Sequence, residues 1–192
     1  MIWIYLQNHT RIFNAKSALL HIAPEFELMQ EFLKFKNISY SACDNFTDSY
    51  EYFGAVKKED LCNLTYPENS FNFIVCNHVL EHIEDDRKAL ESLYSVLSEN
   101  GILIITVPIN SSREETVENS TYNTRELRER HFGQHNHVRQ YGMDIMERFS
   151  SAGFKAECIK STDFFEKEVL EKSGILEDVF FVLKKIIKRI LN

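Results

Sequence analysis

The chain has 192 residues, of which 44% are hydrophobic and 27% charged, and its formal net charge is −7 at pH 7. This length suits one α/β domain, and the composition excludes disordered, collagen-like and low-complexity classes. The acidic balance disfavours broad binding to nucleic-acid backbones, which requires clustered Lys and Arg, and no apolar run approaches the roughly 20 residues that span a bilayer.

The first part of the chain predicts strands on either side of a helix. Residues 17–23 form a short apolar run that is typical of a strand. Apolar residues recur at helical spacing over 25–36 and predict a helix, and a second strand follows over 38–43. Residues 55–60 predict a short strand at the edge of a sheet.

The middle of the chain predicts a buried strand, a helix and another strand. The buried strand covers 71–76. Asp85 is the expected N-cap of the following helix, and Gly101 is expected to stop it. A β-branched strand over 102–108 comes next, and its proline ends it.

A long polar stretch over 109–142 then interrupts this rhythm, and it carries three of the seven histidines. In a compact domain such a stretch is usually a functional lid or a binding loop for substrate. A helix over 141–153 follows, with Gly153 as its stop. Strands over 154–160 and 178–185 complete the pattern.

Seven strands alternating with helices predict an α/β fold, specifically a Rossmann-like, doubly wound and mostly parallel sheet with helices on both faces. Such a sheet binds ligands at the carboxyl ends of its strands, near the topological switch point. The chain shows no internal repeat and no linker, so we expect a single domain over 1–192.

The cysteines predict a reducing environment. None of the four has C-x-x-C spacing, and three lie in apolar, strand-like surroundings. We therefore expect reduced core thiols and a cytoplasmic protein. The N-terminus becomes polar by residue 7, which argues against a signal peptide. The four cysteines are Cys43, Cys62, Cys76 and Cys158.

Polar side chains follow four of the predicted strands. They are His21 to Glu25 after the first, Asp44 after the second, Asp60 after the third, and 77–82 after the fourth. If the strands lie side by side, these groups converge on one rim. Asp44 then suits the two hydroxyls of a ribose, and Asp60 lies where an adenine amino group would reach it. The alternative is that both aspartates are turn formers or helix caps.

Several segments together resemble the class I S-adenosylmethionine-dependent methyltransferases. In that family an acidic residue, a Pro-x-x-x-(Ser/Phe)-Phe-(Asp) stretch and a Leu-Glu-His segment recur in this order. A helix, a Leu-x-x-x-Gly turn and an apolar strand ending in Val-Pro then follow. The resemblance covers about residues 17–185. The stretches that carry it are 60–86, 97–101, 106–108, 137–142 and 152–154.

The resemblance implies S-adenosylmethionine as cofactor. The family's glycine-rich first loop is replaced here by a His-x-Ala-Pro-Glu variant over 21–25. Alanine is small enough for close approach of the cofactor, and Glu25 is placed to contact its amino group or ribose. The residues expected to bind the cofactor are His21, Ala23, Glu25, Asp44, Asp60, Leu61, Asn77, His78 and Val79.

The implied activity is methyl transfer to a small-molecule acceptor, for which a sugar-like compound such as a saccharide is one candidate. A hydroxyl nucleophile must lose its proton, and histidine is the natural base near neutral pH. His137 is the first candidate for this base and His82 the second, although His137 also suits a purely structural role. Arg139 and Tyr141 are expected to contact substrate.

Three alternatives remain at this stage. The run His78-x-x-Glu81-His82 matches an inverted zinc-peptidase motif, which requires a long helix; outside this run no ligand spacing indicates a metal. The loss of glycines also suits a catalytically idle methyltransferase-like module that binds a partner. The basic, amphipathic tail over 184–192 is either a terminal helix or a contact to another subunit or an anionic membrane surface.

Overall fold

A computed structural model describes residues 1–46, 54–172 and 178–186 of the chain. Its main feature is a seven-stranded sheet with the order β3-β2-β1-β4-β5-β9-β8. The first five of these strands run parallel, and β9 is antiparallel to both of its neighbours. The strands are β1 (Ser17–Ile22), β2 (Ile38–Asp44), β3 (Val56–Lys58), β4 (Phe71–Asn77), β5 (Leu97–Thr106), β8 (Phe154–Lys160) and β9 (Val179–Lys185).

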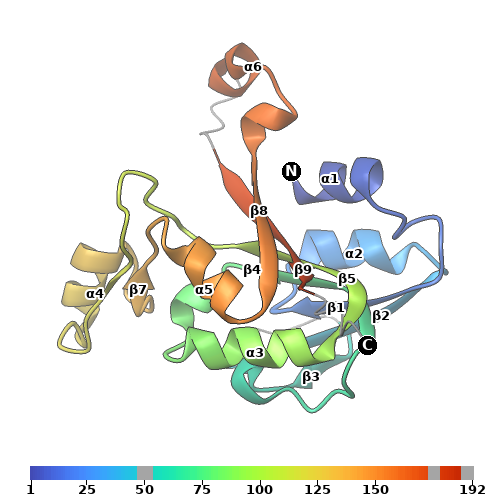
Figure 1. Ribbon diagram of the computed structural model, residues 1–192, viewed down its shortest axis with the longest axis horizontal. Coiled ribbons are helices and arrows are strands. Elements are labelled where there is room, and N and C mark those ends of the chain that lie inside the picture. The colour runs from blue at the N-terminus through green and yellow to red at the C-terminus, as the bar shows by residue number, and fades with distance from the viewer. Residues whose placement is uncertain (47–53, 173–177, 187–192) are drawn as a thin grey trace, which may run out of the picture.

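Helices cover both faces of the sheet, as the sequence predicted (Figure 1). Successive strand residues point to opposite faces, so Leu19 packs in one apolar core with Phe32 while Leu20 packs in the other with Leu90. Each core is closed by its own helices. Helices α1 (Ile2–His9) and α2 (Phe26–Leu33) supply the first core, and α3 (Asp86–Val96) and α5 (Ile145–Ser151) supply the second.

The start of α3 agrees with the sequence, but its end does not. The Asp85 carboxylate accepts a hydrogen bond from the Lys88 backbone N–H at 3.0 Å, so it is the N-cap. Gly101 does not stop the helix, because α3 ends at Val96 and Gly101 lies inside β5. A Cβ atom there would lie 2.6 Å from the Leu97 side chain. Gly101 is therefore required by close packing in a strand whose register against β4 shifts at this point.

Helix α5 is shorter than its predicted span of 141–153. Tyr141 pairs with Ile109 in an isolated bridge, and a Cβ atom on Gly142 would meet the Glu115 backbone at 2.5 Å. These residues are thus held by the preceding segment and are not part of the helix. At the other end, Gly153 has a φ of +92° and terminates the helix as expected.

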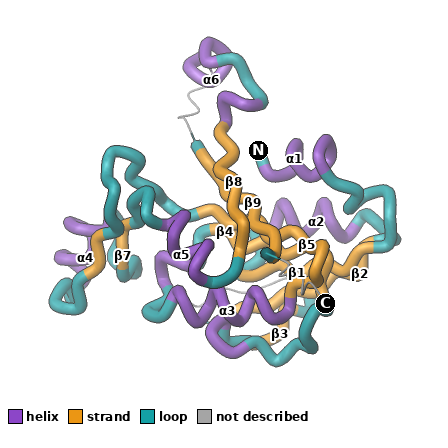
Figure 2. The backbone as a smooth tube through the Cα atoms, in the orientation of Figure 1, coloured by secondary structure: helices purple, strands orange, loops and turns teal. Residues whose placement is uncertain are grey.

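The segment over 109–142 is folded and lies to one side of the sheet (Figure 1). It contains the two-stranded ribbon of β6 (Val117–Glu118) and β7 (Arg139–Gln140), together with α4 (Arg125–Phe132). Figure 2 shows that loops connect these short elements. In the sequence, helix α6 (Lys167–Lys172) comes between β8 and β9. Neither α6 nor α1 was predicted.

Two further predictions concern the cysteines and the tail. All four cysteines are free thiols, and Cys43 and Cys76 are buried. Lys184 and Lys185 belong to β9, so the first part of the predicted tail is strand; its last six residues, 187–192, lie outside the described residues. Among the residues that are described, no helix is long and apolar enough to cross a membrane.

Candidate functional site

The strand order reverses between β1 and β4, because β2 continues on one side and β5 on the other. The loops after these two strands therefore diverge and leave a crevice at the carboxyl ends of the strands. A pocket of about 1020 Å³ opens there. The loops that follow β1, β2, β3 and β4 line it, and the segment over 109–142 contributes Gln134, Asn136 and His137.

The loop after β1 keeps a glycine-like backbone without a glycine. Ala23 has a φ of +44°, which lies in the left-handed region that favours glycine. Its backbone N–H donates to the Cys43 carbonyl at 2.8 Å, which ties the loop to the end of β2. Ala23 and Pro24 both line the pocket. Because alanine carries only a methyl group, the backbone of this loop remains accessible from the pocket.

Glu25 is anchored by side chains from two strands. Its carboxylate lies 2.8 Å from His21 Nε2 and accepts a hydrogen bond from the Asn77 amide at 2.8 Å. Burial raises the pKa of Glu25, but these partners outweigh it and hold the pKa below its usual value. His21 is fully buried and its other ring nitrogen lies 3.0 Å from the Tyr40 hydroxyl. His21 thus holds Glu25 in position but does not itself line the pocket.

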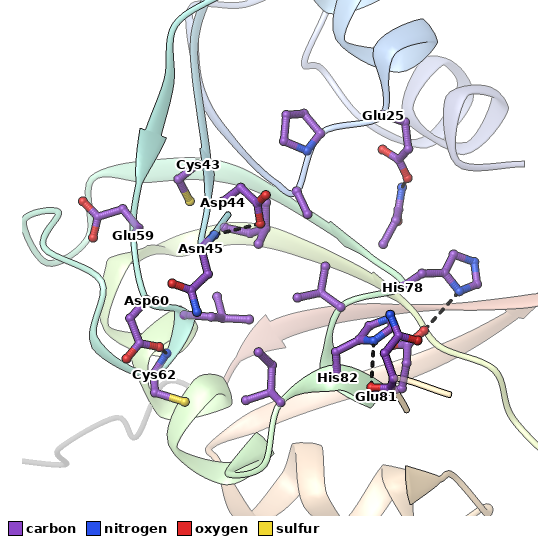
Figure 3. A pocket seen from close by; sticks show the side chains of 18 of the residues that line it. Glu25, Cys43, Asp44, Asn45, Glu59, Asp60, Cys62, His78, Glu81 and His82 are labelled. Carbon is purple, nitrogen blue, oxygen red and sulfur yellow. Dashed lines mark hydrogen bonds and ion pairs between the residues drawn. The ribbon is translucent and has the colours of Figure 1, made fainter. Parts of the chain in front are cut away.

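Asp44 and Asp60 lie across the pocket from His78, Glu81 and His82 (Figure 3). Asp44 ends β2, and its Oδ1 accepts the Asn45 backbone N–H at 2.7 Å. Asp60 accepts the Cys62 backbone N–H at 2.9 Å.

Asp60 therefore caps the short 3-10 turn η1 (Leu61–Asn63) and lines the pocket at the same time, so the helix-cap interpretation and the binding interpretation are compatible. Asn45 and Glu59 also line the pocket, although the sequence analysis did not single them out. Their position next to the two aspartates in the sequence was the only available signal.

The segment after β4 turns sharply at His78, whose φ is +50°. Its backbone N–H donates to the Thr106 carbonyl at 3.0 Å, and its side chain is largely exposed at the pocket rim. Glu81 follows in the 3-10 turn η2 (Leu80–His82) and is 1% exposed. His78 Nδ1 lies 3.4 Å from Glu81 Oε1, and this contact raises the pKa of His78.

This geometry disagrees with the zinc-peptidase alternative. That motif requires both histidines on one long helix, one turn apart. Here η2 has three residues, and His78 lies outside it with a left-handed backbone. The segment is a strand-to-helix connection, as the sequence analysis favoured.

His82 and His137, the two predicted bases, meet at the pocket. Their rings make an edge-to-face contact with centroids 4.8 Å apart. His82 Nδ1 donates to the Asn136 carbonyl at 3.2 Å, and His137 Nδ1 donates to the Phe132 carbonyl at 3.1 Å. Because a carbonyl can only accept, each neutral ring keeps its lone pair on Nε2. Burial lowers the pKa of His137 and favours this neutral form.

Glu81 joins these histidines in one cluster. One ligand atom each from Glu81, His82 and His137 lies within 4.8 Å of the other two. Both Glu81 oxygens are buried, and among the described residues neither has a hydrogen-bond donor, although His78 Nδ1 lies 3.4 Å from Oε1. A carboxylate and two imidazoles are a donor set that a metal ion can use.

Arg139 and Tyr141, the predicted substrate contacts, do not line the pocket. Arg139 is 3% exposed and donates to the carbonyls of Leu80, Ile83 and Glu84, in addition to the Glu118 carboxylate.

The Tyr141 hydroxyl donates to Asp86 at 2.8 Å, and the Tyr141 side chain is 1% exposed. All the polar groups of these two predicted contacts are thus used inside the protein, around the η2 turn. Asn136 and Gln134 reach the pocket from the same segment, and no chemical pattern in the sequence marked them.

Comparison with known proteins gives one family and many similar folds. A family model described as a methyltransferase domain matches residues 25–159. No curated protein matches the chain. The solved structures below are each under 25% identical to the chain, so they show the fold alone.

An S-adenosylmethionine-dependent methyltransferase from Mesorhizobium loti is 13% identical, with a TM-score of 0.62 over 96% of this chain and 97% of that one. A similar methyltransferase from Archaeoglobus fulgidus is 15% identical, with a TM-score of 0.57 over 96% and 93%. The [4+2]-cyclase SpnF is 13% identical, with a TM-score of 0.63 over 92% and 78%.

Proposed function

The chain belongs to the methyltransferase domain family, and on that premise we propose that it transfers a methyl group from S-adenosylmethionine to a small-molecule or sugar-like acceptor. The observation that carries this proposal is the pocket at the carboxyl ends of β1 to β4, whose lining includes the carboxylates of Glu25, Asp44 and Asp60. The cofactor supplies a methyl group on a sulfonium cation, which is already a strong electrophile. The protein then has to bind the cofactor and the acceptor, align them and exclude water from the pocket.

The residues present suit this cofactor. Asp44 would accept hydrogen bonds from the ribose hydroxyls and Asp60 from the adenine amino group, since ionised carboxylates are pure acceptors. Glu25 would attract the ammonium of the methionine part. The left-handed Ala23 supports the view that the His-x-Ala-Pro-Glu loop replaces the family's glycine-rich loop. Leu61, Asn77, His78 and Val79 would line the remaining walls.

The acceptor side of the pocket is formed by the segment over 109–142, which we propose covers the bound acceptor. For a hydroxyl acceptor, His137 is our first candidate for the base. Its Nε2 carries the lone pair when the ring is neutral, and the Phe132 carbonyl holds the ring in this tautomer. His82 is the second candidate, with its ring held in the same way.

Isothermal titration calorimetry with S-adenosylmethionine and S-adenosylhomocysteine tests the cofactor site. We expect wild-type protein to bind both and Asp44→Ala to bind roughly 10–100-fold more weakly, because two hydrogen bonds to a charged acceptor are lost. The matched control is Glu147→Ala, which removes an exposed carboxylate on α5 away from the pocket. No binding by the wild type, or equal affinity for Asp44→Ala, would refute the assignment.

A methyl-transfer screen across sugars, lipids and small acids tests the activity itself. We expect transfer to at least one class, and we expect His137→Ala to slow turnover far more than it weakens cofactor binding. Cofactor binding without transfer to any acceptor would instead support the catalytically idle module.

A further inference from the structure

The cluster of Glu81, His82 and His137 lies at the wall of the pocket and joins two separate segments. One ligand atom from each side chain lies within 4.8 Å of the others. The two segments are tied by backbone contacts, since the Val138 N–H donates to the Glu81 carbonyl at 2.9 Å. A zinc ion bonds nitrogen and oxygen ligands at about 2.0–2.2 Å, so the three side chains would turn towards one another when they bind one ion.

The buried Glu81 carboxylate has few partners: its one ion-pair contact is with His78, whose Nδ1 lies 3.4 Å from Oε1, among the residues that the structure describes. Its side chain is 1% exposed, and within the described part of the chain no group donates a hydrogen bond to either carboxylate oxygen. The side-chain oxygen of Asn136, the residue before His137, is also buried, and no described residue donates a hydrogen bond to it. Burying acceptors without donors is unfavourable, and most strongly so for a carboxylate. A cation bound at this place would compensate the buried acceptor oxygens.

The two histidines are held as metal ligands usually are. A metal-binding histidine typically donates its other ring N–H to a carbonyl or carboxylate, which fixes its tautomer and orientation. His82 does this with the Asn136 carbonyl and His137 with the Phe132 carbonyl, at 3.2 and 3.1 Å. These hydrogen bonds use Nδ1 of each ring, so the Nε2 lone pair of each is left to bind a metal ion.

We propose that Glu81, His82 and His137 bind one divalent transition-metal ion, for which Zn²⁺ is the best fit. Two imidazoles and one carboxylate suit zinc and its neighbours, whereas Mg²⁺ and Ca²⁺ prefer oxygen ligands. This ligand set differs from the peptidase motif, because His137 takes the place of His78.

Three protein ligands leave at least one coordination position open, and the site borders the pocket. An oxygen-bearing acceptor, such as one with a hydroxyl or carboxylate group, is the class that this position would bind. With the ion bound, His82 and His137 are its ligands through Nε2, so neither can be the base; the ion would then lower the pKa of a bound hydroxyl in their place. That part of the inference rests on the proposed methyl transfer, whereas the binding of the ion does not.

The test is metal titration of untagged, metal-free protein in the absence of any methyl donor. Calorimetry should show one equivalent of Zn²⁺ bound per chain and no comparable binding of Mg²⁺. We expect Glu81→Gln and His137→Ala to weaken Zn²⁺ binding roughly 100-fold or more. The matched control is His135→Ala, which removes an exposed histidine of the same segment outside the cluster. It should bind as the wild type does.

Co²⁺ absorption gives a second readout that needs no variant. Intense d–d bands typical of low-coordinate nitrogen and oxygen sites would support the proposal, and the weak spectrum of the hydrated ion would overturn it. Unsaturable Zn²⁺ binding, or equal binding by Glu81→Gln and wild type, would also overturn it. Titration of the same metal-free samples with S-adenosylhomocysteine reports on the cofactor site separately, so a failure of one proposal is distinguishable from a failure of the other.

Discussion

At the scale of single residues, the pocket rim holds two strained positions. Ala23 and His78 are non-glycine residues with φ values of +44° and +50°, and they follow the neighbouring strands β1 and β4. Such backbones persist where the surrounding structure imposes them, and they are common at binding sites. Here hydrogen bonds from the backbone N–H groups, to the carbonyls of Cys43 and Thr106, fix both turns.

Replacing Ala23 with glycine should stabilise the protein. A Cβ atom in the left-handed region costs about 1–2 kcal/mol, and the greater freedom of glycine in the unfolded chain removes roughly 0.5–1 kcal/mol of the gain. We therefore expect Ala23→Gly to raise the free energy of unfolding by about 0.5–1 kcal/mol, measured by urea denaturation.

The comparison variant is Ala156→Gly in β8, where the backbone is ordinary strand. It should lower the free energy of unfolding by about 0.5–1 kcal/mol. If both variants lose stability equally, the left-handed conformation at residue 23 is not a source of strain.

At the scale of elements, buried Arg139 and partly buried Arg148 connect the segment over 109–142 to the η2 turn and the start of α3. Arg139 donates to the Leu80 carbonyl at 3.0 Å and to Glu118 at 2.9 Å. Arg148 on α5 bonds Asp86 and Glu118, both at 2.9 Å. This network holds the turn that carries Glu81 and His82, so it is a positioning device for the pocket wall.

Removing Arg139 should destabilise the whole protein strongly. The change leaves buried carbonyls without donors and leaves Glu118 and Asp86 with only part of their compensating charge, a situation that typically costs about 3–5 kcal/mol. We expect a loss of that size for Arg139→Ala in denaturant unfolding. Arg125→Ala, on the exposed face of α4, should change stability by no more than about 0.5 kcal/mol. A loss below about 1 kcal/mol for Arg139→Ala would contradict the role of the network.

At the scale of the whole molecule, several carboxylates with lowered pKa values link the stability of the fold to pH. Glu59 illustrates this. Burial raises its pKa, but the ion pair with Lys57 and two hydrogen bonds from Thr65 outweigh burial and hold the pKa below its usual value. The pKa values of Glu25 and Glu118 are also lowered, by their hydrogen-bond partners against the effect of burial.

The stability of the protein should therefore fall in acid. A carboxyl with a lowered pKa in the folded state binds fewer protons there than in the unfolded chain, whose glutamates have a pKa of about 4.3. The stabilisation is complete above that pH and is lost as the pH falls through the lower folded values. Thermal melts of the wild type from pH 7 to pH 3 should show this decline.

The variant Glu59→Gln isolates one contribution to this decline. It should be less stable than the wild type by about 1–2 kcal/mol at pH 7, because its hydrogen bonds lose their charge, and the difference should shrink towards pH 3. Glu147→Gln, an exposed change on α5, should follow the wild-type curve. A difference for Glu59→Gln that stays constant with pH would contradict the linkage.

The sequence by itself determined the order and type of most sheet elements, because the spacing of apolar residues is a local property. It also predicted the pocket from Asp44, Asp60 and Asn77, since the carboxyl ends of parallel strands meet at one edge of a sheet. Local signals failed where packing decided, as at Gly101, which resembles a helix stop but fills a tight position in β5.

Only the tertiary structure decided which distant side chains meet. His137 contacts His82 because the segment over 109–142 folds back onto the η2 turn, and no local pattern encodes that approach. The same folding buries Arg139, whose charge in the sequence indicated a contact with substrate. The physical reason is that burial and pairing of a polar side chain depend on segments far away in the chain, whereas strand and helix periodicity depends on neighbouring residues.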